Sequence, residues 1–145
     1  MTALDTNLLF AWLNRGHASH AAAAAWFSAQ AENASLALCE LTLVELYGLL
    51  RNEVLLTRPL GAAEAVETIQ RLRQHPFWEL IDYPGGLMEA VWATAAAPRF
   101  ARRRIYDTRL ALALRHHGVT EFATANVKDF QDFGFTRVWN PLARE

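Results

Sequence analysis

The sequence predicts an α/β fold in which a parallel sheet of about five strands is flanked by helices. Short apolar runs alternate with longer stretches of helical periodicity, as in strands joined by crossover helices. The 145 residues fit a single domain, residues 1–145, which buries roughly two thirds of the surface that the unfolded chain exposes. A composition of 52% hydrophobic and 20% charged residues is typical of a globular protein.

The short apolar segments are the predicted strands. They cover residues 2–4, 36–39, 78–82, 121–124 and 136–139. Each segment is too short for a typical helix and lies next to a stretch with a helical pattern. The alternation therefore predicts parallel strands rather than hairpins.

The predicted helices fill the intervals between these strands. The first begins at Thr6 or Asn7. The other five cover residues 17–31, 41–52, 61–74, 84–97 and 102–118. The second is rich in alanine, which has the highest helix propensity, and the fourth is amphipathic. The fifth follows a Pro-Gly-Gly turn, and the last ends at Gly118, a residue suited to the position after a helix.

The charge is nearly balanced overall but locally concentrated. The net charge of −1 argues against a protein that coats polyanions in general. Thirteen of the fourteen basic residues are arginine, and five of them fall within one segment: Arg99, Arg102, Arg103, Arg104 and Arg109. Arginine suits bidentate contacts with phosphate, so the segment indicates a local anionic partner. A solvated helix face or a set of ion pairs is the alternative.

The sequence shows no sign of a membrane or secreted protein. No apolar run approaches the roughly 20 residues that span a bilayer, and the N-terminus lacks the basic region of a signal peptide. Cys39 is the single cysteine, and its apolar surroundings predict a buried thiol without a disulfide. We therefore expect a cytoplasmic protein with no membrane partner.

Three acidic residues are candidates for a functional site, and each has a structural alternative. Asp5 follows the first strand and is either the N-cap of the next helix or a metal ligand. Glu45 lies three residues after Thr42, a spacing that fits a capping box, although its neighbours are apolar. Asp107 lies on the apolar stripe of its helix and needs a partner, which is either a metal ion or a nearby arginine, Arg103 or Arg104.

A fourth candidate follows the strand that ends at Thr124. Asn126 and Asp129 are typical turn residues, but their place repeats that of Asp5, just past a strand end. These four places meet only if a parallel sheet gathers its carboxyl ends at one edge, as the predicted fold does. His17 and His20 lie near a predicted loop without a matching ligand set, so we interpret them as surface residues.

These residues, in order, resemble the PIN-domain ribonucleases. The pattern is Asp5-Thr6-Asn7, Thr42-x-x-Glu45-Leu46, Asp107, Thr124-x-Asn126-x-x-Asp129-Phe130 and a closing VWNP. It is most similar to the toxin half of VapBC-type toxin–antitoxin pairs. The resemblance implies a PIN-like three-layer fold, a Mg²⁺ or Mn²⁺ site, cleavage of RNA, a homodimer and a small antitoxin that blocks the site.

The resemblance also implies roles for individual residues. Asp5 and Asp107 match the metal ligands, and Glu45 completes the acidic cluster. Many relatives carry an acid where this chain has Asn126, so either Asn126 or Asp129 fills the fourth catalytic position. Three further residues match those that orient the carboxylates, namely Thr6, Asn7 and Thr124.

The implied chemistry is metal-assisted hydrolysis of RNA. Clustered carboxylates repel one another without a cation, and ligands that are all oxygen favour Mg²⁺ or Mn²⁺ over zinc. Three arginines before Asp107 are expected to bind RNA phosphates: Arg102, Arg103 and Arg104. A phosphatase with an aspartyl-phosphate intermediate is disfavoured because Asn7 stands where its second Asp is normal. The alternative function is a catalytically weak module that binds RNA or a partner.

Overall fold

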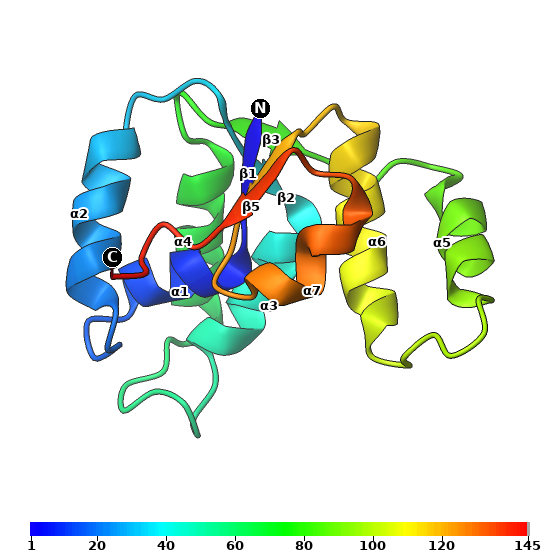
Figure 1. The fold of residues 1–145 in the computed structure, drawn as a ribbon. Helices are drawn as coiled ribbons and strands as arrows, with labels where there is room; N and C mark the ends of the chain where they lie inside the picture. The colour runs from blue at the N-terminus through cyan, green and yellow to red at the C-terminus, as the bar shows by residue number, and fades with distance from the viewer. Residues whose placement is uncertain (145) are drawn as a thin grey trace.

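The computed structural model describes residues 1–144, and its centre is a sheet of five parallel strands (Figure 1). The strands are β1 (Thr2–Leu4), β2 (Leu36–Cys39), β3 (Glu79–Ile81), β4 (Glu121–Ala123) and β5 (Arg137–Trp139). Their order across the sheet is β3-β2-β1-β4-β5, so β1 is central. The five predicted strands are confirmed to within one residue at each end.

Seven helices surround the sheet. They are α1 (Thr6–Leu13), α2 (His20–Gln30), α3 (Glu40–Leu50), α4 (Ala62–Arg73), α5 (Leu87–Ala95), α6 (Arg104–His116) and α7 (Val127–Phe130). The six predicted helices are confirmed, but α7 and the 3-10 turn after it lie where only a turn was expected. A helix of four residues is too short to show a hydrophobic period. Over the described chain, none of the helices has both the length and the apolar character needed to cross a bilayer.

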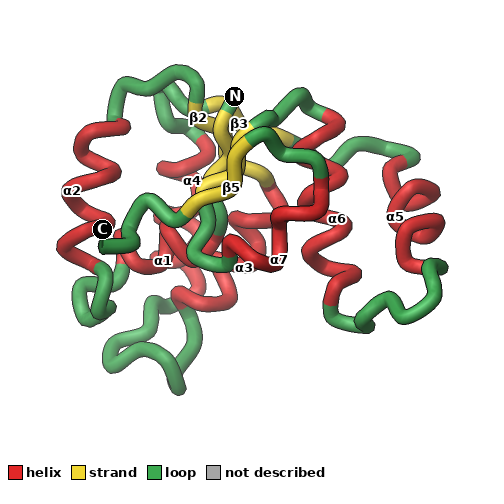
Figure 2. The backbone as a smooth tube through the Cα atoms, viewed as in Figure 1, coloured by secondary structure: helices red, strands yellow, loops and turns green. Residues whose placement is uncertain are grey.

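Helices cover both faces of the sheet, and α5 packs against the outer side of α6 (Figure 2). Side chains alternate between the faces along each strand, as the pleat requires. In β2, Leu36 and Leu38 pack with α1 to α4, whereas Ala37 and Cys39 pack with α6 and α7. Cys39 is buried, as predicted. The predicted three-layer α/β architecture is therefore confirmed.

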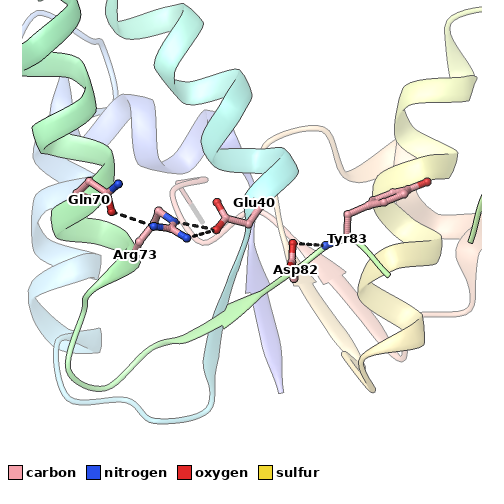
Figure 3. A network of polar contacts seen from close by, with 5 residues as sticks. All are labelled: Glu40, Gln70, Arg73, Asp82 and Tyr83. Atoms are coloured by element: carbon pink, nitrogen blue, oxygen red, sulfur yellow. Dashed lines mark hydrogen bonds and ion pairs between the residues drawn. The ribbon is translucent and has the colours of Figure 1, made fainter. Parts of the chain in front are cut away.

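An ion pair links the two helices that follow β2 (Figure 3). The Arg73 guanidinium, at the end of α4, lies 2.7 Å from a carboxylate oxygen of Glu40, the first residue of α3. Arg73 also donates to Gln70 at 2.9 Å. Because the pair is only partly buried, its stabilisation is modest. The pair ties the end of α4 to the start of α3.

Candidate active site

The predicted acidic residues gather at the carboxyl edge of the sheet. There the strand ends meet the starts of α1, α3 and α7 (Figure 1). A cavity of about 800 Å³ opens at this edge, and Asp5, Glu45 and Asp107 all line it. Since these residues come from α3, α6 and the end of β1, the parallel topology is what brings them together.

Asp5 is the most constrained of the three carboxylates. It is the N-cap of α1, where Oδ1 accepts a hydrogen bond of 2.7 Å from the Thr6 amide. Its other oxygen, Oδ2, accepts from the Thr124 hydroxyl at 2.6 Å and from the Asn7 side-chain amide at 3.2 Å. The residue is 6% exposed, yet it lines the cavity. The predicted cap is confirmed, and capping does not remove the carboxylate from the cavity.

The hydroxyl of Thr124 joins the ends of β1 and β4. It donates to Asp5 and accepts from the Asn126 amide at 3.0 Å and from the Asn7 side chain at 3.3 Å. The Asn7 side-chain oxygen accepts from the Ala125 amide at 3.1 Å. Asp5, Asn7 and Thr124 therefore form one hydrogen-bonded unit across neighbouring strands.

Glu45 reaches the cavity by a different route from the one its sequence spacing suggested. The predicted capping box is wrong, because α3 begins at Glu40 with Cys39 as its N-cap, and this places Thr42 inside the helix. The apolar strand runs directly into the helix, so helical backbone starts earlier than the polar signal. Glu45 Oε2 instead lies 3.1 Å from the Thr6 hydroxyl, which is also 3.1 Å from the Thr42 carbonyl. This contact links α3 to α1.

Asp107 lies half-buried in the first turn of α6. Among residues 1–144 it forms no ion pair, so neither Arg103 nor Arg104 is its partner. Arg104 instead lies 3.9 Å from Asp132 and over the ring of Phe133. Sequence spacing along α6 did not reveal this partner, because Asp132 and Phe133 come from the turn after α7.

The pKa values of Asp5 and Asp107 are both raised, chiefly by burial. Burial raises the pKa of Asp5 from 3.8 to about 6, and the charges of Glu45 and Asp107 add to the rise. Hydrogen bonds from Thr124 and Thr6 oppose it. The pKa of Asp107 is also raised by burial and by nearby carboxylates, with Arg104 lowering it. Negative charge in this cavity is therefore only partly compensated by the chain.

The structure separates the two candidates for the fourth catalytic position. Asn126 lines the same cavity as Asp5, and its amide donates to Thr124. Asp129 is exposed on α7 and lines a separate, more open hollow. After burial, its negative charge contributes most to the raised pKa of Asp107. Asn126 therefore lines the cavity together with the carboxylates, whereas Asp129 does not line it.

The family model for the PIN domain matches residues 2–135, which include all of these side chains. The chain belongs to the PIN-domain family. It is also 50% identical over 145 residues to Ribonuclease VapC24 of Mycobacterium tuberculosis, covering 100% of this chain and 99% of that protein. A match of this extent places the chain with the VapC ribonucleases inside the PIN-domain family.

Solved structures of other proteins share the fold at low sequence identity. The crystal structure of Mycobacterium tuberculosis VapC20, described as a Sarcin-Ricin loop cleaving toxin, is 19% identical, with a TM-score of 0.71 over 94% of this chain and 97% of that one. FitAcB from Neisseria gonorrhoeae is 21% identical, with a TM-score of 0.63 over 99% and 100%. DNA-bound VapBC from Salmonella typhimurium is 17% identical, with a TM-score of 0.60 over 97% of each chain.

Several residues that line the cavity of this PIN domain were not among the predicted site residues, and they include Phe10, His17, Tyr106 and Arg109. His17 lies in the loop before α2, outside the helix predicted over 17–31, and it is half-buried rather than a surface residue. Its Nδ1 accepts from the Ser19 backbone amide. Tyr106 and Arg109 follow Arg103 at intervals of three residues. This helical spacing places them on the same side of α6 as Arg103 and could have identified them from the sequence. Of the three predicted RNA-binding arginines, Arg103 lines the cavity, while Arg102 and Arg104 do not.

The donor chemistry of the cavity fits a hard divalent cation. Within residues 1–144, no three His, Cys, Asp or Glu side chains are close enough together to hold one ion. Mg²⁺ does not need such a group, because it keeps several waters and uses one or two carboxylates. Burial is the main cause of the raised pKa of Asp5, and the charges of Glu45 and Asp107 add to it, so a cation would stabilise the ionised carboxylate.

Proposed function

We propose that this chain is a metal-dependent endoribonuclease, the toxin of a toxin–antitoxin pair, which hydrolyses phosphodiester bonds of RNA. The observation that carries the proposal is the convergence of Asp5, Glu45 and Asp107 on one cavity. The 50% identity to a protein named as a ribonuclease supports the same activity. The fixed orientation of Asp5 supports a catalytic use of its carboxylate, because catalytic groups need to be held in place.

The proposed ligands of Mg²⁺ or Mn²⁺ are Asp5 and Asp107, with Glu45 completing the negative cluster. When bound, such an ion polarises the scissile phosphate and lowers the pKa of a bound water. The chain's own contribution is orientation. Thr6, Asn7 and Thr124 are the proposed orienting residues, since hydrogen bonds from all three hold the Asp5 carboxylate.

The substrate contacts are proposed for the residues beside the carboxylates. Asn126 offers a neutral amide where many relatives have an acid, so metal affinity depends on the other three residues. Arg103, at the start of α6, is in position to bind an RNA phosphate. Arg102 remains a proposed outer contact. The contribution of Arg104 is reduced because its guanidinium already lies near Asp132.

The proposed partner is a cognate antitoxin, and the proposed assembly is a homodimer. Similar folds have been solved as VapBC and as FitAB, which supports a protein partner for this chain. Because the cavity is negative without a cation, we expect the antitoxin to insert an arginine or lysine that pairs with Asp5 or Asp107. Such a group would exclude both metal and substrate.

The proposal is tested by incubating the purified chain with end-labelled RNA in Mg²⁺, in Mn²⁺ and in a chelator. We expect cleavage only with metal, with 5′-phosphate and 3′-hydroxyl ends. The Asp5→Asn variant should lose at least about 100-fold in rate, because a metal ion contributes several kcal/mol to catalysis. Asp82→Asn is the matched control, since Asp82 also follows a strand and is exposed but does not line the cavity.

Asn126 favours a second candidate, a PIN-like module that binds RNA or a partner without cutting. The same experiment separates the two. Binding without metal-dependent cleavage would support the module, and cyclic phosphate as the main product would contradict metal-activated water as the nucleophile.

A further inference from the structure

Three side chains of α6 line the cavity from successive turns. Arg103 stands just before the helix, Tyr106 lies in its first turn, and Arg109 follows one turn later. At a rise of about 1.5 Å per residue, the two arginines are about 9 Å apart along the axis, with the tyrosine between them. We call these three residues the α6 ladder.

Arg109 differs from the other partly buried arginines of the described chain, which are Arg73 and Arg104. Arg73 is paired with Glu40, and Arg104 lies beside Asp132. Arg109 forms no ion pair with any of residues 1–144, and its buried Nε has no hydrogen-bond partner. A desolvated donor without a partner is costly, so its persistence in a cavity fits a role toward an anion supplied from outside.

Tyr106 supplies the second observation. Its side chain is 67% exposed, although it lines a cavity beside the buried core. An exposed aromatic ring next to cationic groups is the arrangement with which proteins bind single-stranded nucleic acid, the base stacking on the ring. The ring is not needed for packing, because most of its surface contacts solvent.

We propose that the α6 ladder is a subsite for one unpaired nucleotide next to the cleaved bond. Tyr106 stacks on the base, Arg109 binds the adjoining phosphate through its guanidinium, and Arg103 binds the next phosphate outward. The inference rests on the proposed ribonuclease function and adds the residues that hold the nucleotide beside the cleaved bond. In a duplex both faces of each base are covered by neighbours, so the ring of Tyr106 has no face to stack on.

The test measures RNA binding in a chelator, where metal-dependent cleavage does not interfere. The probe is a short unstructured RNA labelled with fluorescein, used alone or annealed to its complement, and the readout is fluorescence anisotropy. The wild-type chain should bind the single strand at least about 10-fold more tightly than the duplex. Tyr106→Ala should lose about 10-fold in affinity for the single strand, whereas Tyr106→Trp should keep it.

Arg109 is tested by the salt dependence of the same binding. Arg109→Ala should weaken single-strand binding about 10-fold and reduce the slope of log affinity against log salt by about one. Arg109→Lys should keep most of the slope but lose affinity, because lysine keeps the charge without the planar fork. Thermal unfolding of each variant shows whether it is folded.

The matched controls are residues of the same types outside the cavity. Trp92 is an exposed aromatic residue on α5, and Arg58 is an exposed arginine in the loop before α4. Trp92→Ala and Arg58→Ala should leave both the affinity and the salt slope unchanged. Equal losses in these controls would mean that the effect is not specific to the ladder, and the proposal would be rejected.

Two other results overturn the inference. The first is that Tyr106→Ala and Arg109→Ala both bind single-stranded RNA as tightly as the wild-type chain does. The other is a loss of affinity only for the antitoxin, which would make the ladder a protein-binding surface. These failures differ from failure of the proposed function. If the wild-type chain cuts RNA with Mg²⁺ while the ladder variants bind normally, only the ladder is rejected.

Discussion

The two sides of the active-site cavity are held in different ways. On the β1 and β4 side, Asp5, Asn7 and Thr124 satisfy one another through hydrogen bonds between neighbouring strands. On the α6 side, Asp107 is half-buried without an ion pair among residues 1–144, and the buried Nε of Arg109 has no partner there. The chain thus fixes one side of the site completely and leaves polar groups on the other side for a ligand to satisfy.

This difference follows from where each side is anchored. Strand ends in a parallel sheet are positioned by backbone hydrogen bonds on both flanks, so a side chain there is placed with little freedom. The start of α6 is held instead by side-chain contacts of Arg104 with Asp132 and Phe133. These contacts leave Asp107 without an ion pair and the Nε of Arg109 without a hydrogen-bond partner among residues 1–144.

Asp5, on the β1 and β4 side of the cavity, should make the metal-free protein less stable as the pH rises. Unfolded Asp5 loses its proton near pH 3.8, whereas folded Asp5 keeps it to about pH 6. Between these values the folded state binds more protons, so the free energy of unfolding falls with rising pH and levels off above 6. Relative to Asp5→Asn, the fall should be on the order of 3 kcal/mol.

Urea unfolding of both proteins from pH 4 to pH 8 in a chelator measures this effect. Saturating Mg²⁺ should restore much of the loss in the wild type only. If the free energy of unfolding changed with pH in the same way in both proteins, the Asp5 carboxyl would not be the group with the raised pKa.

Replacing Thr124 should damage both stability and activity. Thr124→Val leaves Asp5 and the Asn126 amide without their shared partner, which should cost about 1 to 3 kcal/mol in unfolding free energy. The rate of RNA cleavage should fall about 10- to 100-fold, as expected for residues that orient metal ligands. Denaturant titration and cleavage assays measure the two effects.

Thr108→Val is the matched control for Thr124→Val. Thr108 is also fully buried, but its hydroxyl makes one hydrogen bond, to the Arg104 carbonyl of the same helix. It should lose much less stability and little activity. Equal losses in the two variants would mean that burial of a threonine, not the contact with Asp5, explains the effect.

On the α6 side of the cavity, we expect replacement of Arg109 to raise the free energy of unfolding, not to lower it. Arg109→Leu removes the unpartnered guanidinium and should raise the free energy of unfolding of the free protein by about 1 kcal/mol, while RNA affinity falls. Thermal and urea unfolding without RNA measure the gain. A loss of stability would show that Arg109 packs as a structural residue, and the two sides of the cavity would then be alike.

The smallest effect is expected at Thr42. Its hydroxyl is buried and has no hydrogen-bond partner within residues 1–144, so Thr42→Val should leave stability unchanged or raise it by up to about 1 kcal/mol. The same urea titration compares this variant with Thr124→Val, in which the lost hydroxyl does have hydrogen-bond partners. Destabilisation at Thr42 would indicate that its hydroxyl is solvated in the native protein.

The sequence predicted the parts of the site that depend on topology. Each strand ends near its predicted residue, so Asp5 and Thr124 had to meet once β1 and β4 were neighbours. It failed where two local signals competed. Thr42 and Glu45 have the spacing of a capping box, but the apolar continuation of β2 starts the helix earlier. Arg104 fits an ion pair with Asp107 by helical spacing, yet Asp132, distant in sequence, is closer.

The contact between Thr124 and Asp5 also has a consequence for synthesis of the chain. These residues are 119 positions apart, and a protein emerges from the ribosome with its N-terminal end first. Until β4 has emerged and paired with β1, nothing in the nascent polypeptide supplies the hydroxyl that orients the first carboxylate. A fragment that ends at α5 lacks Asp107 as well. The site therefore assembles only after β4 has been synthesised and has paired with β1.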